Sequence, residues 1–257
     1  ISELEKVTGA RYVESIADNC VKHHKKLYSF FDIDKRLDPE AIKGLLYYYP
    51  KISGLRQRET TYKIYDIGVP VLCVVGTSSR QGKFTVQLAL RQAFMEAGYN
   101  VGQLGTEPTS LLFGMDSVYP MGYEGCIDVK GLDAVYTANR IMGYIQSKRV
   151  DIILAGSQSR VHVLYPSGYT GNTTSQYEFL LGCQPDAYIL CVNLEDSVDD
   201  IRETIRFLES IYGAKVLSVV LSPISSGSKW SIINSNKNKV APAALKAKIE
   251  ELSGPLA

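Results

Sequence analysis

The chain has 257 residues, and its 28 lysines and arginines nearly balance 27 aspartates and glutamates, which gives a net charge of +1. Apolar residues make up 45% of it and charged residues 21%, which excludes a disordered or coiled-coil chain. Without a charge excess, nucleic acid and anionic lipid are not expected as partners. One imbalance stands out: 17 tyrosines against 7 phenylalanines and one tryptophan. Tyrosine is half apolar and half polar, so it suits interfaces and ligand pockets.

Composition also bears on location. The longest apolar run, around Val69–Val75, is far shorter than the roughly 20 residues of a membrane-spanning helix, and no signal peptide is recognisable. The five cysteines include no CxxC pair, so buried free thiols are expected rather than disulfides or a zinc site. We expect a cytoplasmic homo-oligomer with a small-molecule substrate and no membrane partner.

Two regions follow each other along the chain. Residues 1–66 predict a mainly helical N-terminal region without a strong strand. Asp38-Pro39-Glu40 is typical of a helix start, and the run Tyr47-Tyr48-Tyr49-Pro50 would end that helix. Residues 67–257 predict an α/β domain, in which apolar runs alternate with amphipathic helices.

The alternation in the second region is regular. Strands are expected at 69–75, 100–105, 150–155, 187–192 and 215–221, and helices at 86–97, 132–146, 198–212 and 242–252. Strands that are apolar throughout indicate a parallel sheet with helices on both faces. Residues 106–127, with several Gly, Pro and Tyr, predict a long loop, and residues 222–239, rich in Ser, Asn and Lys, predict a mobile segment.

The first strand of this domain leads into a candidate phosphate-binding loop (P-loop). The strand ends, a loop turns between two glycines, and a helix begins with Gly-Lys. Backbone N–H groups and the helix dipole would then point at one spot, where Lys83 would reach the phosphates. The candidate cofactor-binding residues are Gly76, Thr77, Ser78, Ser79, Arg80, Gln81, Gly82, Lys83, Phe84 and Thr85.

The match to the usual pattern is imperfect. The glycines are separated by five residues rather than four, and Phe84 stands where a Mg²⁺-binding Ser or Thr usually follows the lysine. The hydroxyl comes one place later, at Thr85. The alternative interpretation is an ordinary strand-turn-helix with a solvated lysine.

This loop resembles that of dethiobiotin synthetase and its relatives. The offset Gly-Lys-x-Thr is more similar to an uncharacterised bacterial and archaeal family of P-loop proteins, some of which are identified as D-glutamate N-acetyltransferases. Three further segments are similar to that family: residues 152–159, residues 165–171 and the Pro-Asp-Ala strand at 185–191. The resemblance covers roughly residues 69–221, and it implies that residues 1–66 are the remnant of that family's preceding domain. The family's strand-end Glu is Ala155 here, its His before Pro is Tyr165, and an acidic residue expected after Asp116 is absent.

Carboxylates near the loop are candidates for the chemistry. Mg²⁺ prefers oxygen ligands, and Glu107 follows the second strand directly, where ligands of open parallel sheets bind. We therefore predict Lys83, Glu107 and Asp116 as catalytic residues and Thr85 and Glu107 as metal ligands, with Ser78 as another possible hydroxyl. The alternative for either carboxylate is a structural role, such as capping a helix.

A polar, Tyr- and Gly-rich segment follows the third strand and is a candidate substrate site, with a surface loop as the alternative. Its candidate residues are Gln158, Ser159, Tyr165, Ser167, Tyr169 and Thr170. The tyrosine excess is consistent with this: Tyr119, Tyr123, Tyr165 and Tyr169 are predicted to line one pocket, while Tyr47–Tyr49 suit a contact of the N-terminal region.

Three functions fit these features. The first is an ATP- and Mg²⁺-dependent enzyme that phosphorylates or otherwise activates a small carboxylate or amino-acid-like substrate, as a kinase or ligase does. The second, suggested by the resemblance, is an acetyl-CoA-dependent N-acyltransferase. The third is a nucleotide-dependent accessory or switch protein in a biosynthetic or peptide-maturation system, because Phe84 and Ala155 replace expected metal ligands.

Overall fold

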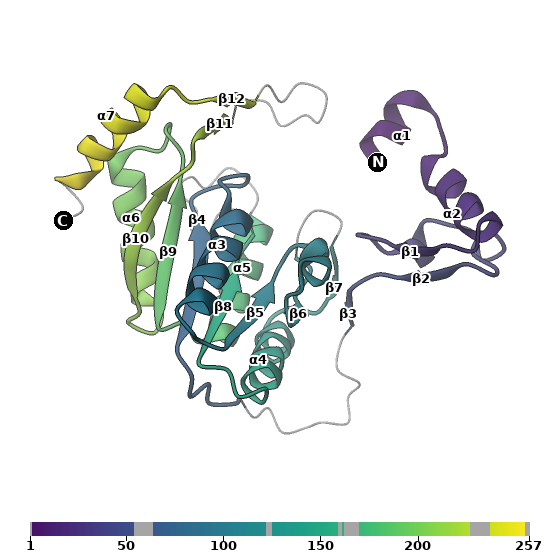
Figure 1. Cartoon of the computed structure of the whole chain (residues 1–257), viewed down its shortest axis with the longest axis horizontal. Coiled ribbons are helices and arrows are strands. Elements are labelled where there is room, and N and C mark those ends of the chain that lie inside the picture. Colours follow the sequence, from purple (N-terminus) through teal and green to yellow (C-terminus); the bar gives the residue numbers. More distant parts are fainter. Residues whose placement is uncertain are drawn as a thin grey trace.

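The larger part of the molecule is built around a parallel sheet. The computed structural model describes residues 2–53, 64–121, 125–158, 161, 170–226 and 237–254. Within them, the main sheet has the strand order β10-β9-β4-β8-β5-β6, and all its pairs are parallel (Figure 1). The strands are β4 (Val71–Gly76), β5 (Val101–Gly105), β6 (Ser117–Val118), β8 (Ile152–Gly156), β9 (Ala187–Val192) and β10 (Lys215–Leu221). The predicted parallel α/β fold is confirmed.

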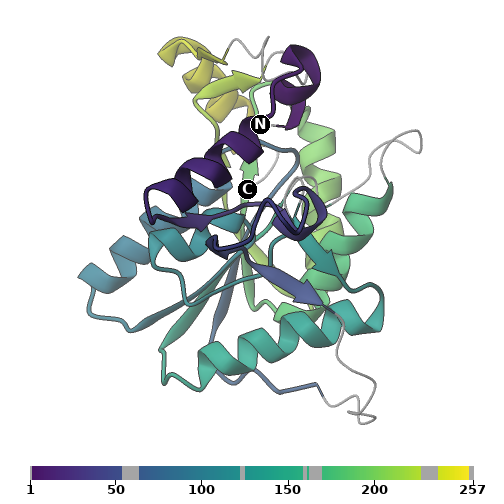
Figure 2. The same cartoon turned by 90° about the vertical axis from the view of Figure 1, so that its right-hand side faces the viewer.

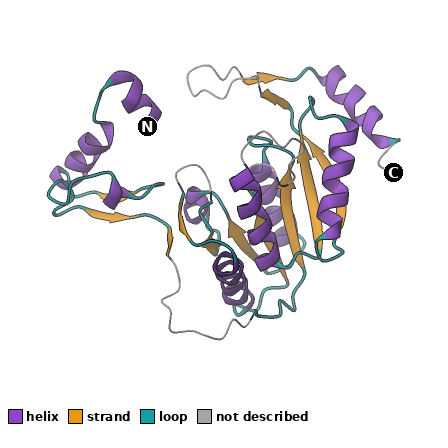
Figure 3. Cartoon of the chain, turned by 180° about the vertical axis from the view of Figure 1, so that it is seen from behind, coloured by secondary structure: helices purple, strands orange, loops and turns teal. Residues whose placement is uncertain are grey.

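Helices cover both faces of this sheet (Figure 3). They are α3 (Lys83–Glu96), α4 (Leu132–Gln146), α5 (Thr170–Cys183), α6 (Val198–Ser210) and α7 (Pro242–Ser253). Alternate residues of one strand point to opposite faces. In β4, Leu72 and Val74 therefore pack with the apolar side chains of α3, whereas Val71, Cys73 and Val75 pack on the other face with those of α4, α5 and α6.

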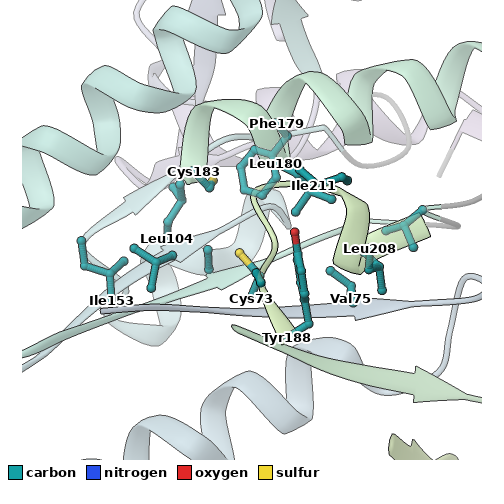
Figure 4. Packing of buried hydrophobic residues seen from close by; sticks show 14 of the residues in the cluster. Cys73, Val75, Leu104, Ile153, Phe179, Leu180, Cys183, Tyr188, Leu208 and Ile211 are labelled. Atoms are coloured by element: carbon teal, nitrogen blue, oxygen red, sulfur yellow. The ribbon is translucent and has the colours of Figure 1, made fainter. Parts of the chain in front are cut away.

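The second of these faces carries the larger core. Tyr188 of β9 and Phe179 of α5 are among its largest fully buried side chains, and Figure 4 shows them with Cys73 and Leu208 between the sheet and the helices. Burying one such large apolar side chain stabilises the fold by about 1.5–3 kcal/mol. The rigid sheet that results fixes the positions of the loops at its carboxyl edge.

Helix α5 is absent from the elements that the sequence predicts. Its buried apolar side chains, Phe179, Leu180 and Cys183, gather in its second half, whereas the first half reads Thr-Gly-Asn-Thr-Thr-Ser-Gln. A periodic apolar face therefore spans only about two turns, which is too short to indicate a helix reliably. The helix forms because α4 packs along it.

The expected long loop at 106–127 contains regular structure. Among its described residues, η2 (Pro108–Phe113) is a 3₁₀ helix, β6 joins the edge of the main sheet, and β7 (Cys126–Asp128) begins a further pairing. Pro108 at the start of η2 has the fixed φ that suits a first helical turn. Gly114 ends it with a left-handed φ of 73°.

The N-terminal region combines helices with short strands, which the sequence analysis does not predict. Helices α1 (Ser2–Thr8) and α2 (Tyr12–Lys22) are followed by β1 (Lys26–Tyr28), the short 3₁₀ helix η1 (Ile33–Lys35), β2 (Leu46–Tyr48) and β3 (Lys51–Ser53). Residues 39–44 form turns, so no helix starts at Asp38. Aromatic residues favour strands, and in β2 Tyr47 packs on a small apolar core while Tyr48 is exposed, which is the alternation of a strand.

Among the described residues, strand β3 and Tyr28 both connect this N-terminal region to the sheet domain. Strand β3 pairs in parallel with β7, with Ile52 opposite Ile127. In addition, the Tyr28 hydroxyl donates a hydrogen bond to the carbonyl oxygen of Pro108 over 2.7 Å. Figure 2 shows the region in front of the sheet domain. Tyr47 of β2 and Tyr49, just after this strand, stabilise the N-terminal region itself, since their hydroxyls both donate to Asp34.

The predicted mobile segment at 222–239 is described only in part. Strands β11 (Ile224–Ser226) and β12 (Lys237–Lys239) form an antiparallel pair, and residues 227–236 lie outside the described residues. Helix α7 then follows as predicted.

All five cysteines are free thiols, and all except the half-buried Cys20 are buried, as the sequence predicts.

Candidate functional site

The candidate P-loop connects β4 to α3. Gly76 ends the strand, Lys83 starts the helix, and both Arg80 and Gly82 adopt left-handed φ angles, of 63° and 81°. Such alternation of the backbone turns successive N–H groups toward one concave spot, next to the positive end of the helix dipole. Gly76 is required for packing, because a Cβ there would lie 2.5 Å from Gln81 Oε1.

Lys83 lies folded back under the loop. Its side chain is buried, and its Nζ donates a hydrogen bond to the carbonyl oxygen of Ser78 over 2.6 Å. Burial lowers the pKa of Lys83 to about 8, although the nearby Cys191 and Glu107 oppose this decrease. Within the described part of the chain, the Lys83 ammonium makes one hydrogen bond, to a neutral carbonyl, so the loss of its hydration is poorly compensated. The site is therefore electrostatically prepared for an anion.

A hydrogen-bond network locks the loop to the turn after β9. One oxygen of Asp196, Oδ2, accepts from the Thr77 hydroxyl, from Gln81 Nε2 and from the backbone N–H of Asn193. Gln81 also accepts from the N–H of Ser78 through its Oε1. Thr77 and Gln81 were predicted as cofactor-binding residues, but their side chains hold the loop in shape.

Asp196 is a residue that the sequence analysis missed. Its partners Thr77 and Gln81 lie more than 100 positions earlier in the chain, so no local motif connects them. The available signal was topological. Asp196 follows β9, the neighbour of β4, at the carboxyl edge where the loops of a parallel sheet converge.

The loop borders a large cavity of about 1390 Å³. Ligand pockets commonly occupy about 300–1000 Å³, so this one has room for two small molecules or one long one. The wall near the loop is made by residues 79–87, Thr106, Glu107, residues 156–158 and residues 220–224. The remainder is lined by residues 119–121, 125, 127, 129–130, 175–176 and 178.

The structure brings several predicted residues together in this cavity. Residues 79–85, which include Lys83, line it together with Glu107 and Gln158. Gly76, Thr77 and Ser78, at the start of the loop, are not part of the wall. Tyr119 also lines it, as predicted, and burial raises the pKa of its hydroxyl. Tyr123, Ser159, Tyr165, Ser167 and Tyr169 lie outside the described residues. Thr170 begins α5, and its side chain is not described.

The contacts of Asp116 do not support the catalytic role that the sequence predicts for it. It is not among the residues that line the cavity. Its Oδ2 accepts from the N–H of Gln103, and its Oδ1 forms an ion pair with Lys148 over 2.7 Å. These contacts tie the segment between η2 and β6 to β5 and to the turn after α4, so they give Asp116 a structural role.

The hydroxyl expected after Lys83 is displaced. Phe84 packs edge-to-face on Phe113, with 5.2 Å between the ring centroids. Thr85 is exposed and contributes to the cavity wall. Residues of an α-helix are separated by about 100°, so the side chain of Thr85 leaves the helix roughly 200° away from that of Lys83. Thr85 is therefore poorly placed to bind the same ligand as Lys83.

Ser157 is the second residue that the sequence analysis missed. It follows β8 directly, lines the cavity and is only 4% exposed. Its Oγ is buried and, among the described residues, has no hydrogen-bond partner. Next to it, the N–H of Gln158 donates to Oε1 of Gln176, a buried side chain of α5.

The far part of the cavity combines apolar and charged groups. Met121, Ile127 and Val129 supply apolar wall, while Lys130 and Glu178 supply one charge of each sign. Glu178 Oε1 accepts from the N–H of Gly131, at the start of α4. A wall of this kind complements a molecule that carries both an apolar part and opposite charges.

Two further observations concern the described residues as a whole. None of their helices combines the length and apolar character needed to cross a membrane. They also contain no group of three or more His, Cys, Asp or Glu side chains arranged to hold a metal ion by themselves.

Comparison with known proteins identifies the family. Residues 59–256 match the model described as a domain of unknown function, DUF1611, P-loop domain. The chain belongs to this DUF1611 family. The match covers more than half of the chain and includes the loop at 76–83, so the prediction of a P-loop protein is confirmed. No curated protein matches the chain.

Solved structures include another DUF1611 protein. The crystal structure of a family member from Anabaena variabilis has 17% identity and a TM-score of 0.58, over 89% of this chain and 66% of its own. The present chain thus spans just under two thirds of that protein. A nucleotide-binding protein from Archaeoglobus fulgidus in complex with ADP has 13% identity and a TM-score of 0.42, over 70% and 77%.

Proposed function

We propose that this DUF1611 protein is an ATP- and Mg²⁺-dependent enzyme that transfers a phosphoryl group to, or otherwise activates, a small amino-acid-like carboxylate. The observation that carries the proposal is the buried Lys83 at the N-terminus of α3, inside a cavity with space beyond the loop. ATP would supply the phosphoryl group and the free energy. The chain's own part is to hold the phosphates, balance their charge and place the acceptor.

The residues of the loop fit a nucleotide phosphate chain. The left-handed turns at Arg80 and Gly82 present backbone N–H groups, and Gly76 leaves the space that a Cβ would fill. A phosphate would draw the ammonium of Lys83 away from the Ser78 carbonyl, and its negative charge would offset the burial of that ammonium. The loop need not reorganise for this, because Asp196 already holds it in place.

Mg²⁺ also fits the groups that line the cavity. Glu107 offers a carboxylate, and the orphaned hydroxyl of Ser157 offers a second oxygen. Mg²⁺ usually keeps several waters and takes only one or two protein ligands besides phosphate oxygens. A dedicated cluster of three acidic side chains is therefore not required.

The far part of the cavity supports an acceptor of the amino-acid class. Lys130 would attract a carboxylate and Glu178 an amine, while Met121, Ile127 and Val129 would contact an apolar side chain. Gln158 and Gln176 line the same cavity, and the N–H of Gln158 donates to Oε1 of Gln176. An acceptor held there would face the end of the phosphate chain, and such positioning accounts for much of the catalysis in phosphoryl transfer.

Calorimetric titration with ATP·Mg²⁺, followed by assays for ADP formation with pools of amino acids and small carboxylates, tests this proposal. We expect binding by the wild type, substrate-stimulated ADP formation, and loss of both in Lys83→Met. An exposed lysine on α7, changed in Lys246→Met, is the matched control and should alter neither. Absence of nucleotide binding by the wild type would refute the proposal.

A second candidate keeps the loop but changes its ligand. Phe84 and Ala155 occupy positions where metal ligands are expected, and a pyrophosphate bound without a metal, such as that of acetyl-CoA, would suit the same loop. The protein would then acylate the amino group of its acceptor. A thermal shift with acetyl-CoA but none with ATP·Mg²⁺ would favour this activity. Nucleotide-dependent capture of a partner, with negligible turnover, would instead favour a switch or accessory role.

A further inference from the structure

The hydroxyl of Ser157 is an unexplained polar group. Ser157 is 4% exposed, and its Oγ has no hydrogen-bond partner among the described residues. Leaving a buried hydroxyl unsatisfied destabilises a fold, so such groups are rare and need an explanation. Two other buried serines at the carboxyl edge show the usual solution, since Ser110 donates to the carbonyl oxygen of Glu107 and Ser222 to that of Ile224.

The position of Ser157 places it beside the candidate phosphate site. Strand β8 pairs directly with β4, with Gly156 opposite Val74, and the N–H of Ser157 donates to the carbonyl oxygen of Val74. Ser157 therefore lies where the P-loop leaves the sheet, and it lines the same cavity as Lys83 and Glu107.

The surrounding side chains leave a role for this hydroxyl. The position after Lys83 is taken by Phe84, which packs on Phe113, and Thr85 leaves α3 in another direction. The end of β8 offers no carboxylate, because Ala155 is a fully buried part of the core. Ser157 thus carries a buried hydroxyl that is adjacent to the loop and has no hydrogen-bond partner within the described part of the chain.

We propose that Ser157 Oγ binds the hydrated Mg²⁺ that accompanies the terminal phosphates of the nucleotide, in place of the hydroxyl that usually follows the P-loop lysine. This inference rests on the proposed function, since it requires that the loop hold nucleotide phosphates. It assigns the oxygen to a hard cation, for which a neutral hydroxyl is a suitable ligand. Its cost in the free protein is an unsatisfied hydroxyl, which the bound cation would satisfy.

The test compares ATP binding with Mg²⁺ and with excess chelator, by calorimetry on the full chain. One interaction of a hydroxyl with a charged group is worth about tenfold in affinity. We expect Mg²⁺ to strengthen ATP binding to the wild type, and Ser157→Ala to lose about tenfold of that gain while binding metal-free ATP normally. Thr85→Ala, the control at the other candidate hydroxyl, should retain the gain.

The thermal stability of the free protein provides a second readout. Because no described residue bonds to Ser157 Oγ, Ser157→Ala should melt at the same temperature as the wild type or at a higher one, whereas Ser110→Ala should melt lower. An unchanged Mg²⁺ gain in Ser157→Ala, or no Mg²⁺ gain in a wild type that binds ATP, would overturn this inference alone. A wild type that binds no nucleotide would overturn the proposed function as well.

Discussion

Replacing Lys83 by methionine should make the free protein more stable while abolishing its binding of nucleotide. Burial lowers the pKa of Lys83 from 10.5 to about 8, and one pKa unit corresponds to about 1.4 kcal/mol. Keeping this side chain protonated at pH 7 thus costs the folded state about 3 kcal/mol. The methionine variant also loses the hydrogen bond from Lys83 to the Ser78 carbonyl, which reduces the stability gain by about 1 kcal/mol. This loss is small because Ser78 is half-buried, so water can bond to its carbonyl instead. Methionine has a similar length and no charge, so we expect a net gain of about 2 kcal/mol.

The pH dependence of this gain provides a sharper test. The folded-state pKa lies below the unfolded-state value, so between about pH 8 and 10.5 the unfolded chain binds more protons and the wild type gains stability as pH rises. Lys83→Met lacks this titration. The difference in unfolding free energy between the two proteins should therefore be greatest near pH 7 and shrink toward pH 10.

Urea denaturation of both proteins at several pH values measures this difference, and titrations common to both cancel. Lys246→Met, at an exposed position of α7, should lie within about 0.5 kcal/mol of the wild type throughout. A less stable Lys83→Met protein at pH 7, or a difference independent of pH, would refute the burial argument. Retained ATP binding in this variant would refute the role of the lysine.

Three further predictions concern the same loop. Asp196→Ala should lower the free energy of unfolding by about 2–3 kcal/mol, because three donors lose the carboxylate oxygen that accepts from them. Urea denaturation measures this change, and Glu195→Ala, at the exposed neighbouring position, should have no effect beyond about 0.5 kcal/mol. ATP affinity, measured by calorimetry, should fall as pH rises above about 8, by up to about tenfold per pH unit, because binding selects the protonated Lys83; an unchanged affinity at pH 9 would contradict this. Gly76→Ala should weaken ATP binding at least tenfold, since the new Cβ would lie 2.5 Å from Gln81 Oε1 and displace the loop; normal affinity in this variant would show that the loop tolerates the displacement.

The sheet domain could be predicted from the sequence because its signals are local. Strands such as Ala187–Val192 are apolar throughout, and the P-loop is one continuous segment between a strand and a helix. Both features depend on neighbouring residues, so a single sequence is sufficient to recognise them. Helix α5 lacks such a local signal, because only its second half carries buried apolar side chains. Tertiary packing on α4 stabilises this helix instead.

The N-terminal region shows where local patterns mislead. Three-residue strands such as β1 and β2 are too short to have a recognisable period, and their pairing joins residues 20 positions apart. Pro39 after Asp38 is a good helix start in isolation, yet Leu45 must reach a core shared with Ile33 and Val13, and the chain turns instead. Tertiary burial therefore overrides the local propensity.

The site could be predicted only where one segment carries it. Lys83 and Glu107 each follow a strand end, and the carboxyl-edge rule places both at one cavity. Asp196 and Ser157 could not be selected in this way, because their importance lies in a long-range hydrogen-bond network and in a missing partner. Asp116, a carboxylate farther along the loop that follows the second strand, forms an ion pair with Lys148 and does not line the cavity.

The most direct test of the central claim is a crystal structure of this DUF1611 protein grown or soaked with ATP and Mg²⁺. We predict density for the phosphates against the loop 76–83, with the ammonium of Lys83 moved from the Ser78 carbonyl to a phosphate oxygen. Absence of nucleotide from this loop at saturating ATP, or nucleotide bound elsewhere with Lys83 still on Ser78, would contradict it.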